Sequence, residues 1–155
     1  MNLGTIRQFT ANFCGDPDIS RITTARYNEA INRAQEQFAA DSKALFKTVT
    51  WTSATDIAKY ALPTDFTYEI SVKFDGKELT PITRHRLDEV SGDDWSDDAG
   101  TPTHYIVDPE EGRKELLVYP IPTSADDSKT IAMRYYPIPA EMSSDTATPL
   151  NSSAL

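Results

Sequence analysis

Residues 23–52, TTARYNEAINRAQEQFAADSKALFKTVTWT, decide the fold, because the hydrophobic period changes within them. In the first part, apolar side chains recur at spacings of four, three and four residues, which is typical of an amphipathic helix capped by Thr23 or Thr24. We expect the stripe to pack inward; it consists of Tyr27, Ile31, Ala34 and Phe38. From Phe46 onward bulky and polar residues alternate, as in a half-buried strand. The stretch therefore predicts a helix that ends near residue 44 or 45 and leads into a sheet.

A charged stripe runs beside the apolar one on the same predicted helix. It consists of Arg26, Glu29, Arg33 and Glu36. Opposite charges fall three and four residues apart, a spacing that stabilises a helix by about 0.2–0.5 kcal/mol per pair.

A shorter helix is predicted ahead of this one. Ile6, Phe9 and Phe13 share one face over residues 3–13. The helix should end at the Gly15–Asp18 break, because glycine can cap a helix and Pro17 disfavours helical geometry at the residue before it. Cys14, the single cysteine, cannot form an internal disulfide and is interpreted as a small hydrophobic residue at this helix end.

Short β-like segments dominate the rest of the chain. Such segments lie within residues 46–52, 60–63, 66–74, 77–80, 103–107, 115–119 and 130–136, and five or six short antiparallel strands are predicted from them. Asp75-Gly76 between two such runs indicates a hairpin. Residues 83–90 predict a short helix with Leu87 and Val90 on one side. The residues from 91 to 102, 108 to 112 and 124 to 128 predict polar loops or turns.

The predicted fold class is α+β, because helices and strands are segregated along the chain. We expect N-terminal antiparallel helices over residues 1–47, an antiparallel β-rich lobe over 48–137 and an extended tail over 138–155. Alternating aromatic residues favour a sheet core over a platform for stacking bases. They are Trp51, Tyr60, Phe66, Tyr68 and Phe74, of which the last three share a predicted face with Ile70 and Val72.

Composition argues against several functional classes. The formal charge is −9 with a pI near 4.6, and the longest basic cluster is Arg84-His85-Arg86, so tight phosphate binding is not expected. The N-terminus has no secretory signal pattern and the apolar runs are too short to span a membrane. We therefore expect a soluble protein that is made in the cytoplasm.

No pattern for catalysis or cofactor binding stands out. The acidic residues Asp93, Asp94, Asp97 and Asp98 form either a solvated loop or a cation site, but they lack the order of an EF-hand loop. His85 and His104 are too far apart in sequence for a histidine-rich metal motif. The scattered glycines form neither a P-loop nor a dinucleotide fingerprint. The sequence thus favours a protein without enzymatic activity, catalytic residues, metal or cofactor.

The order and spacing of several short motifs resemble tailed-phage head–tail adaptor (connector) proteins. The matching segments are residues 3–7 (LGTIR), 15–17 (GDP), 27–35 (YNEAINRAQ), 60–66 (YALPTDF), 74–82 (FDGKELTPI), 100–105 (GTPTHY), 117–122 (LVYPIP) and 134–136 (RYY). Members of this family generally end in further helices after a Thr-Pro segment. Here Thr148-Pro149 is followed by only six residues (150–155), so we expect a short member or a trimmed chain.

The resemblance implies a structural virion protein of the phage neck or tail. Such adaptors form a ring, usually of about twelve copies, with the portal protein above and a tail or neck protein below. DNA would pass through the ring without specific binding, and no membrane is implied. On this basis the charges of Arg26, Glu29, Arg33 and Glu36 either pair across subunits or face the channel; otherwise they are merely solvated. The alternative functions are another tail or neck tube component, and a small cation-binding module or hydrolase.

Overall fold

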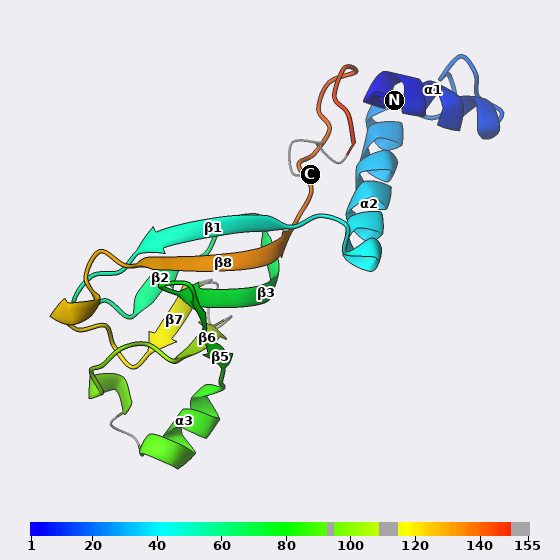
Figure 1. Ribbon diagram of the computed structural model, residues 1–155. Coiled ribbons are helices and arrows are strands. Elements are labelled where there is room, and N and C mark those ends of the chain that lie inside the picture. The colour runs from blue at the N-terminus through cyan, green and yellow to red at the C-terminus, as the bar shows by residue number, and fades with distance from the viewer. Residues whose placement is uncertain (93–94, 109–114, 150–155) are drawn as a thin grey trace. The chain divides into compact units, whose positions relative to one another are not determined.

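The computed structural model describes residues 1–92, 95–108 and 115–149. Of the turn predicted at 108–112, Asp108 is the last residue of a strand, and residues 109–112 lie outside the described residues. The chain divides into two compact units (Figure 1). The helical unit comprises Met1–Phe46 and the chain from Pro137 onward, and the sheet unit comprises Lys47–Tyr136. The α+β prediction is confirmed, since the helical unit carries the two predicted N-terminal helices and the sheet unit carries the strands.

The helical unit contains α1 (Leu3–Phe13) and α2 (Thr24–Ser42), both close to the predicted ranges. Asn2 caps α1, because its side-chain Oδ1 accepts the Thr5 N–H at 2.9 Å. Gly15 follows α1 with a φ of +70°, in keeping with its predicted role at the helix end. In Figure 1, α1 lies across the N-terminal end of α2, so the helices cross instead of running antiparallel along their lengths.

The buried face of α2 differs from the predicted apolar stripe. Tyr27 and Ile31 are buried, but Ala34 is exposed and Phe38 exposes 57% of its surface. The buried face instead continues through Asn32, Gln35 and Ala39. The reason lies in the C-terminal segment, whose backbone supplies hydrogen-bond partners to these amide side chains. The prediction that Ala34 and Phe38 pack inward is therefore wrong for the helical unit.

Residues 138–149 contain no helix or strand, and they pack onto the helices of the same unit as a strap. The Asn32 side chain donates to the Met142 carbonyl at 3.2 Å and accepts the Met142 N–H at 3.0 Å. Gln35 donates to the Ala140 carbonyl at 3.0 Å, and Arg7 forms a bidentate ion pair with Asp145 at 2.7 and 2.9 Å. Met142 also joins Leu3 and Ile31 in a small core. We call residues 138–149 the strap.

The predicted apolar face of α1 is largely uncovered. Leu3 and Ala11 are fully buried, whereas Phe9 and Phe13 expose 68% and 87% of their surface. The sequence predicted only that Ile6, Phe9 and Phe13 share one face of α1, and the two phenylalanines of that face lie in solvent. Only Ile6 packs against the small core of the unit.

Two four-stranded sheets make up the sheet unit, with strand orders β1-β8-β3-β4 and β2-β7-β6-β5. The strands are β1 (Lys47–Thr52), β2 (Lys59–Ala61), β3 (Phe66–Phe74), β4 (Lys77–Glu78), β5 (Thr80–Pro81), β6 (His104–Asp108), β7 (Glu115–Tyr119) and β8 (Thr130–Pro137). The pairs β1–β8, β3–β4, β2–β7 and β6–β7 are antiparallel. The predicted antiparallel lobe is confirmed, and the two-residue pair β5–β6 is parallel.

The core of the sheet unit lies between the two sheets. Val72, Ile131 and Met133 from the first sheet and Tyr105, Leu116 and Val118 from the second belong to one buried cluster. Tyr60, Phe66 and Phe74 are in this cluster and Trp51 packs against it, which confirms their interpretation as core residues. Tyr68 and Ile70 are the exception, since they expose 65% and 39% of their surface. The predicted shared face of β3 is therefore buried only at its two ends.

Local signals in the sheet unit are confirmed. Asp75 and Gly76 adopt φ values of +48° and +79° between β3 and β4, as a two-residue hairpin turn requires. Helix α3 (Arg84–Ser91) begins after Thr83, whose side chain accepts the Arg86 N–H. Its Leu87 is buried with Ile106 and Leu117, and Trp95 of the 3₁₀ helix η1 (Trp95–Asp97) packs against them. A second 3₁₀ helix, η3 (Ser124–Asp126), occupies the predicted polar turn before β8.

Candidate interaction surfaces

The charged stripe of α2 lies fully on the surface of the helical unit. Arg26, Glu29, Arg33 and Glu36 are all exposed. Arg33 Nη2 lies 2.7 Å from Glu29 Oε1, an exposed pair that stabilises the helix by at most about 0.5 kcal/mol. Neither Arg26 nor Glu36 has an ion-pair partner within residues 1–92, 95–108 and 115–149. The stripe thus keeps one internal pair and presents further charge to solvent.

Helical geometry divides the stripe into two rows of opposite sign. At 3.6 residues per turn, positions seven apart lie nearly above one another. Arg26 and Arg33 therefore form a basic row, and Glu29 and Glu36 form an acidic row beside it. A surface with a basic and an acidic edge is complementary to a copy of itself in a head-to-tail arrangement.

Exposed aromatic side chains are a second feature of the helical unit. Phe9 and Phe13 are four residues apart, so they lie on the same side of α1. Phe38 is exposed as well, near the C-terminal end of α2. Contiguous exposed apolar surface commonly marks a contact site in soluble proteins. We call Phe9 and Phe13 the α1 aromatic pair.

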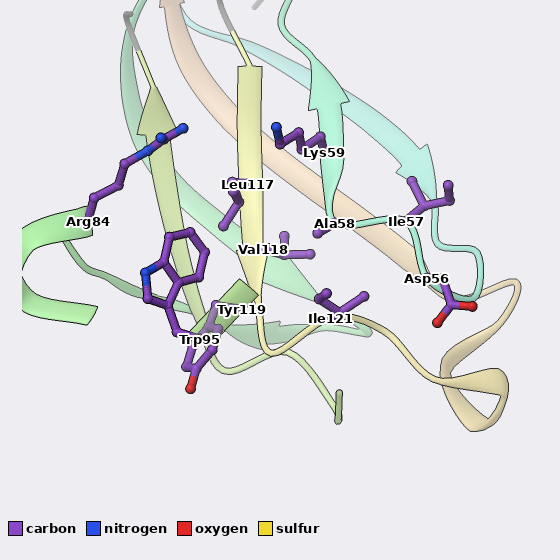
Figure 2. Close-up of a pocket in the computed structure, with 10 residues that line it drawn as sticks. All are labelled: Asp56, Ile57, Ala58, Lys59, Arg84, Trp95, Leu117, Val118, Tyr119 and Ile121. Carbon is purple, nitrogen blue, oxygen red and sulfur yellow. The ribbon is translucent and has the colours of Figure 1, made fainter. Parts of the chain in front are cut away.

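The sheet unit contains a cavity of about 530 Å³. Figure 2 shows it over β7, with α3 and η1 on one side and the chain that leads into β2 on the other. Leu117, Val118 and Ile121 contribute apolar lining, and Trp95 and Tyr119 contribute aromatic lining. A preformed, mostly apolar hollow of this size falls within the range of ligand sites in proteins.

The aromatic lining is held in place by hydrogen bonds. The Trp95 Nε1–H donates to Asp88 Oδ1 at 2.6 Å, and the Tyr119 hydroxyl donates to Asp98 Oδ2 at 2.6 Å. The Tyr119 oxygen also lies 2.9 Å from Ser91 Oγ. The hydrogen bond to Asp98 raises the pKa of Tyr119 above its ordinary value, since Asp98 accepts the phenolic proton and so favours the protonated form. The two rings meet edge to face, with centroids 6.3 Å apart and planes at 81°.

Charges of opposite sign line different parts of this cavity. Lys59 of β2 and Arg84 of α3 flank Leu117, and Asp56 lies beyond Ile57 in Figure 2. The cavity therefore has a basic part and an acidic part separated by apolar side chains.

The residues considered for metal binding or catalysis are dispersed. Asp93 and Asp94 lie outside the described residues, and Asp98 is engaged by Tyr119. His85 lies 3.3 Å from Glu89 on α3, and His104 Nδ1 lies 2.8 Å from Thr103 Oγ1. Among the described residues, no three His, Cys, Asp or Glu side chains gather as metal ligands would. Cys14 lies exposed at the C-cap of α1.

Sequence patterns did not indicate the cavity. Its lining comes from four elements that the fold brings together, as shown by Lys59, Arg84, Trp95 and Tyr119. Hydrophobic periodicity within one segment does not predict which other segments that segment will contact. A weak signal was available at Trp95, because a tryptophan in an acidic, loop-like stretch needs a partner for its ring and its N–H.

Comparison with known proteins gives one family. The family model described as SU10 adaptor protein matches residues 1–155, the full length of the sequence. No curated protein matches the chain. Within the described residues, no helix has the length and apolar character needed to cross a membrane.

Proposed function

The chain belongs to the SU10 adaptor protein family, and from this premise we propose that it forms a ring between the portal and the tail of a phage particle. The family is one of phage head–tail adaptors, so the chain is a structural adaptor protein and a virion component. The proposed ring contains about twelve copies and continues the DNA channel below the portal. The single observation that carries the proposal is the family match over the whole chain.

The helical unit supports assembly on physical grounds. A closed ring needs two different surfaces on each copy that are complementary to each other. The basic and acidic rows of α2 meet this need, and the α1 aromatic pair adds apolar area that the helical unit leaves in solvent. We assign Arg26, Glu29, Arg33 and Glu36 to the contact between neighbouring copies.

The net negative charge of the chain is compatible with a role in a DNA channel. With a formal charge of −9, the chain repels the phosphate backbone, so DNA can pass without binding tightly. The portal above and a tail or neck protein below are the proposed partners.

Charge-swap variants test the ring and the assigned contact together. Purified virions that carry the Arg26→Glu variant should contain less of the chain, because a glutamate in the formerly basic row then faces the neighbour's acidic row and is repelled by it. Glu36→Arg alone should act in the same direction, and the double variant should restore incorporation. Lys77→Glu, an exposed charge change in the sheet unit, is the matched control.

Two results would contradict different parts of this proposal. Absence of the chain from purified virions contradicts the adaptor ring itself. Normal incorporation of both single variants contradicts only the contact assigned to α2. Electron microscopy of the particle gives the copy number and separates the ring below the portal from another position in the neck or tail tube.

A further inference from the structure

We propose that the first sheet continues from copy to copy, with β1 of one copy pairing in parallel with the open edge of β3 in the next. The contact deepens the proposed ring and rests on it, and it uses none of the charged residues of α2. The two edges lie on opposite sides of one sheet and differ in sequence. They therefore provide the two unlike surfaces that a head-to-tail contact needs.

Strand β1 is an unprotected edge strand. Among the described residues it pairs with β8 alone, and Figure 1 shows it at the rim of the first sheet. The register runs from Lys47 with Tyr135 to Thr52 with Thr130 without a bulge, and the strand contains no proline. Its charged residue, Lys47, is held by Asp65 at 2.6 Å. Soluble proteins protect lasting edges with bulges, prolines or free charges, so this edge is typical of a strand that gains a partner.

Alternate residues of β1 direct their peptide groups away from β8. The Ser53 N–H donates to the Lys129 carbonyl at 2.8 Å, which adds the next pair to the β1–β8 register. Because the direction of hydrogen bonding alternates along a strand, the odd-numbered residues of β1 face β8 and the even-numbered residues face outward. The outward residues are Thr48, Thr50 and Thr52, and all three are exposed.

The side of β3 that faces away from β8 is open over residues 67–71. β4 pairs only with the last two residues of β3, and the Leu79 N–H donates to the Val72 carbonyl at 2.8 Å before the chain enters the second sheet. By the same alternation, Tyr68 and Ile70 direct their N–H and carbonyl groups to this side. No backbone hydrogen bond to these groups is formed on this side within the described part of the chain.

β1 and β3 run in the same direction, because both are antiparallel to β8. β3 begins beside the end of β8, where the Tyr135 hydroxyl donates to Asp65. It ends beside the start of β8, where the Asp75 N–H donates to the Thr130 carbonyl at 2.8 Å. A neighbouring copy that continues the sheet with its core on the same side therefore brings its β1 to β3 in parallel.

The open length of β3 sets the register of this pair. Because the Val72 carbonyl is already bonded, β1 of the neighbour fits beside the residues before it, with Val49 next to Tyr68 and Trp51 next to Ile70. Val49 and Trp51 are half-buried and pack against the core, and Tyr68 and Ile70 alternate with buried residues of β3. All four side chains thus lie on the core side of the continued sheet. Aromatic and β-branched neighbours across strands stabilise a sheet.

This register gives every outward peptide group of Tyr68 and Ile70 a partner. The Tyr68 N–H donates to the Thr48 carbonyl of the neighbouring copy, and the Tyr68 carbonyl accepts the neighbour's Thr50 N–H. Ile70 bonds in the same way to Thr50 and Thr52. Both strands keep their pairing with β8, so the contact forms without rearrangement of either copy.

A pair of cysteines on the outer face of the sheet tests the pairing in purified virions. In a Cys14→Ser background, which removes the native thiol, Thr50→Cys and Glu69→Cys lie opposite each other across the contact. Within one copy β8 separates them by at least two strand spacings of about 4.8 Å each, and a disulfide spans no more than about 7 Å between Cα atoms. Mild oxidation should therefore give a ladder of covalent multimers on a non-reducing gel.

A proline in the same background tests the role of the backbone. The Thr52 N–H points away from β8, so Thr52→Pro removes it without breaking a bond to β8. The ladder should then disappear. Thr52→Ala keeps the N–H and is the matched control, in which the ladder should remain. Either cysteine without the other should give no cross-linked product.

Hydrogen exchange of the wild-type chain guards against variants that misfold. Peptides that span residues 47–52 and 67–71 should both exchange several-fold more slowly in virions than in the isolated chain.

The pairing is overturned if virions hold the double-cysteine chain without a ladder, if the ladder survives Thr52→Pro, or if one cysteine alone gives dimers. Protection of only one of the two edges also overturns it, because that edge then takes a different occupant. A ring seen by electron microscopy in any of these cases leaves the proposed function standing. Absence of the chain from virions contradicts the ring and this contact together.

Discussion

Tyr135 is a buried residue of the sheet unit whose hydroxyl is hydrogen-bonded to a carboxylate. Its side chain exposes 4% of its surface, and its hydroxyl donates to Asp65 Oδ1 at 2.9 Å. Burial and the neighbouring carboxylate raise the pKa of Tyr135 to about 12. Burial alone would raise the pKa of Asp65, but hydrogen bonds from Lys47 Nζ and from Tyr135 lower it. The three side chains thus stabilise the protonated phenol and the ionised carboxylate together.

The raised pKa predicts a stability loss at alkaline pH. In the unfolded chain Tyr135 ionises near pH 10, whereas in the folded chain it stays protonated up to about 12. Its contribution is therefore complete below pH 10 and is lost as the pH rises from 10 through 12. We expect the free energy of unfolding, measured with urea, to fall less steeply over this window in Tyr135→Phe than in the wild type. Equal slopes would show that Tyr135 has an ordinary pKa.

Gly76 is required by backbone geometry at the tip of the β3–β4 hairpin. Its φ is +79°, and a Cβ built there would meet nothing within 4 Å. Gly76→Ala should therefore lower the free energy of unfolding by about 1–2 kcal/mol, because alanine is strained in the left-handed backbone conformation. The matched control is Gly100→Ala, whose added Cβ would lie at an ordinary 3.5 Å from Pro120. Chemical denaturation measures both, and a Gly76→Ala variant as stable as the control would refute the backbone explanation.

At the scale of elements, the strap supplies the hydrogen-bond partners of buried polar residues on α2. Asn32 exposes 6% of its surface and makes hydrogen bonds in both directions with the Met142 backbone. A buried amide in a helix is costly unless its polar atoms are paired. The strap therefore allows polar residues on the buried side of α2, and α2 in turn fixes the course of residues 138–149.

Removal of the amide should release the strap. Asn32→Ala leaves the Met142 N–H and carbonyl without their partner. This loss should lower the free energy of unfolding by about 1–3 kcal/mol. Hydrogen exchange, followed by mass spectrometry, should then speed up in residues 138–149 before it does in β8. Gln37→Ala is the control, because Gln37 is an exposed residue of α2 that bonds only to Asp41 among the described residues. Unchanged exchange in the strap of Asn32→Ala would show that other contacts hold it.

The sequence predicted elements better than it predicted the faces they bury. The range of β3 and the Asp75-Gly76 turn follow from local chemistry, and both are confirmed. The strands β4 and β5 have two residues each, which is too short to show a period. The buried face of α2 depends on Met142, which lies 110 residues after Asn32, so local periodicity pointed to Phe38 instead. The cavity was missed for the same reason, because its lining residues come from separate segments.

At the scale of the whole molecule, a chain that works in an assembly can leave its contact residues uncovered in the single copy. The α1 aromatic pair and the two charged rows of α2 fit this description, since both lie on the helical unit and neither is needed for its small core. Residues of this kind contribute little to folding and much to association, so the two properties should separate on mutation.

The double variant Phe9→Ser and Phe13→Ser tests this separation. Because the side chains expose 68% and 87% of their surface, the free energy of unfolding of the isolated chain should change by less than about 1 kcal/mol. If the pair is buried between copies, incorporation into virions should fall several-fold. Leu3→Ala is the contrasting variant, since Leu3 is fully buried and its truncation should cost about 2–5 kcal/mol of folding stability. A double variant that is as stable as the wild type and incorporated equally well would exclude the α1 aromatic pair from the ring contact, and would leave the charged rows of α2 as the surface to examine.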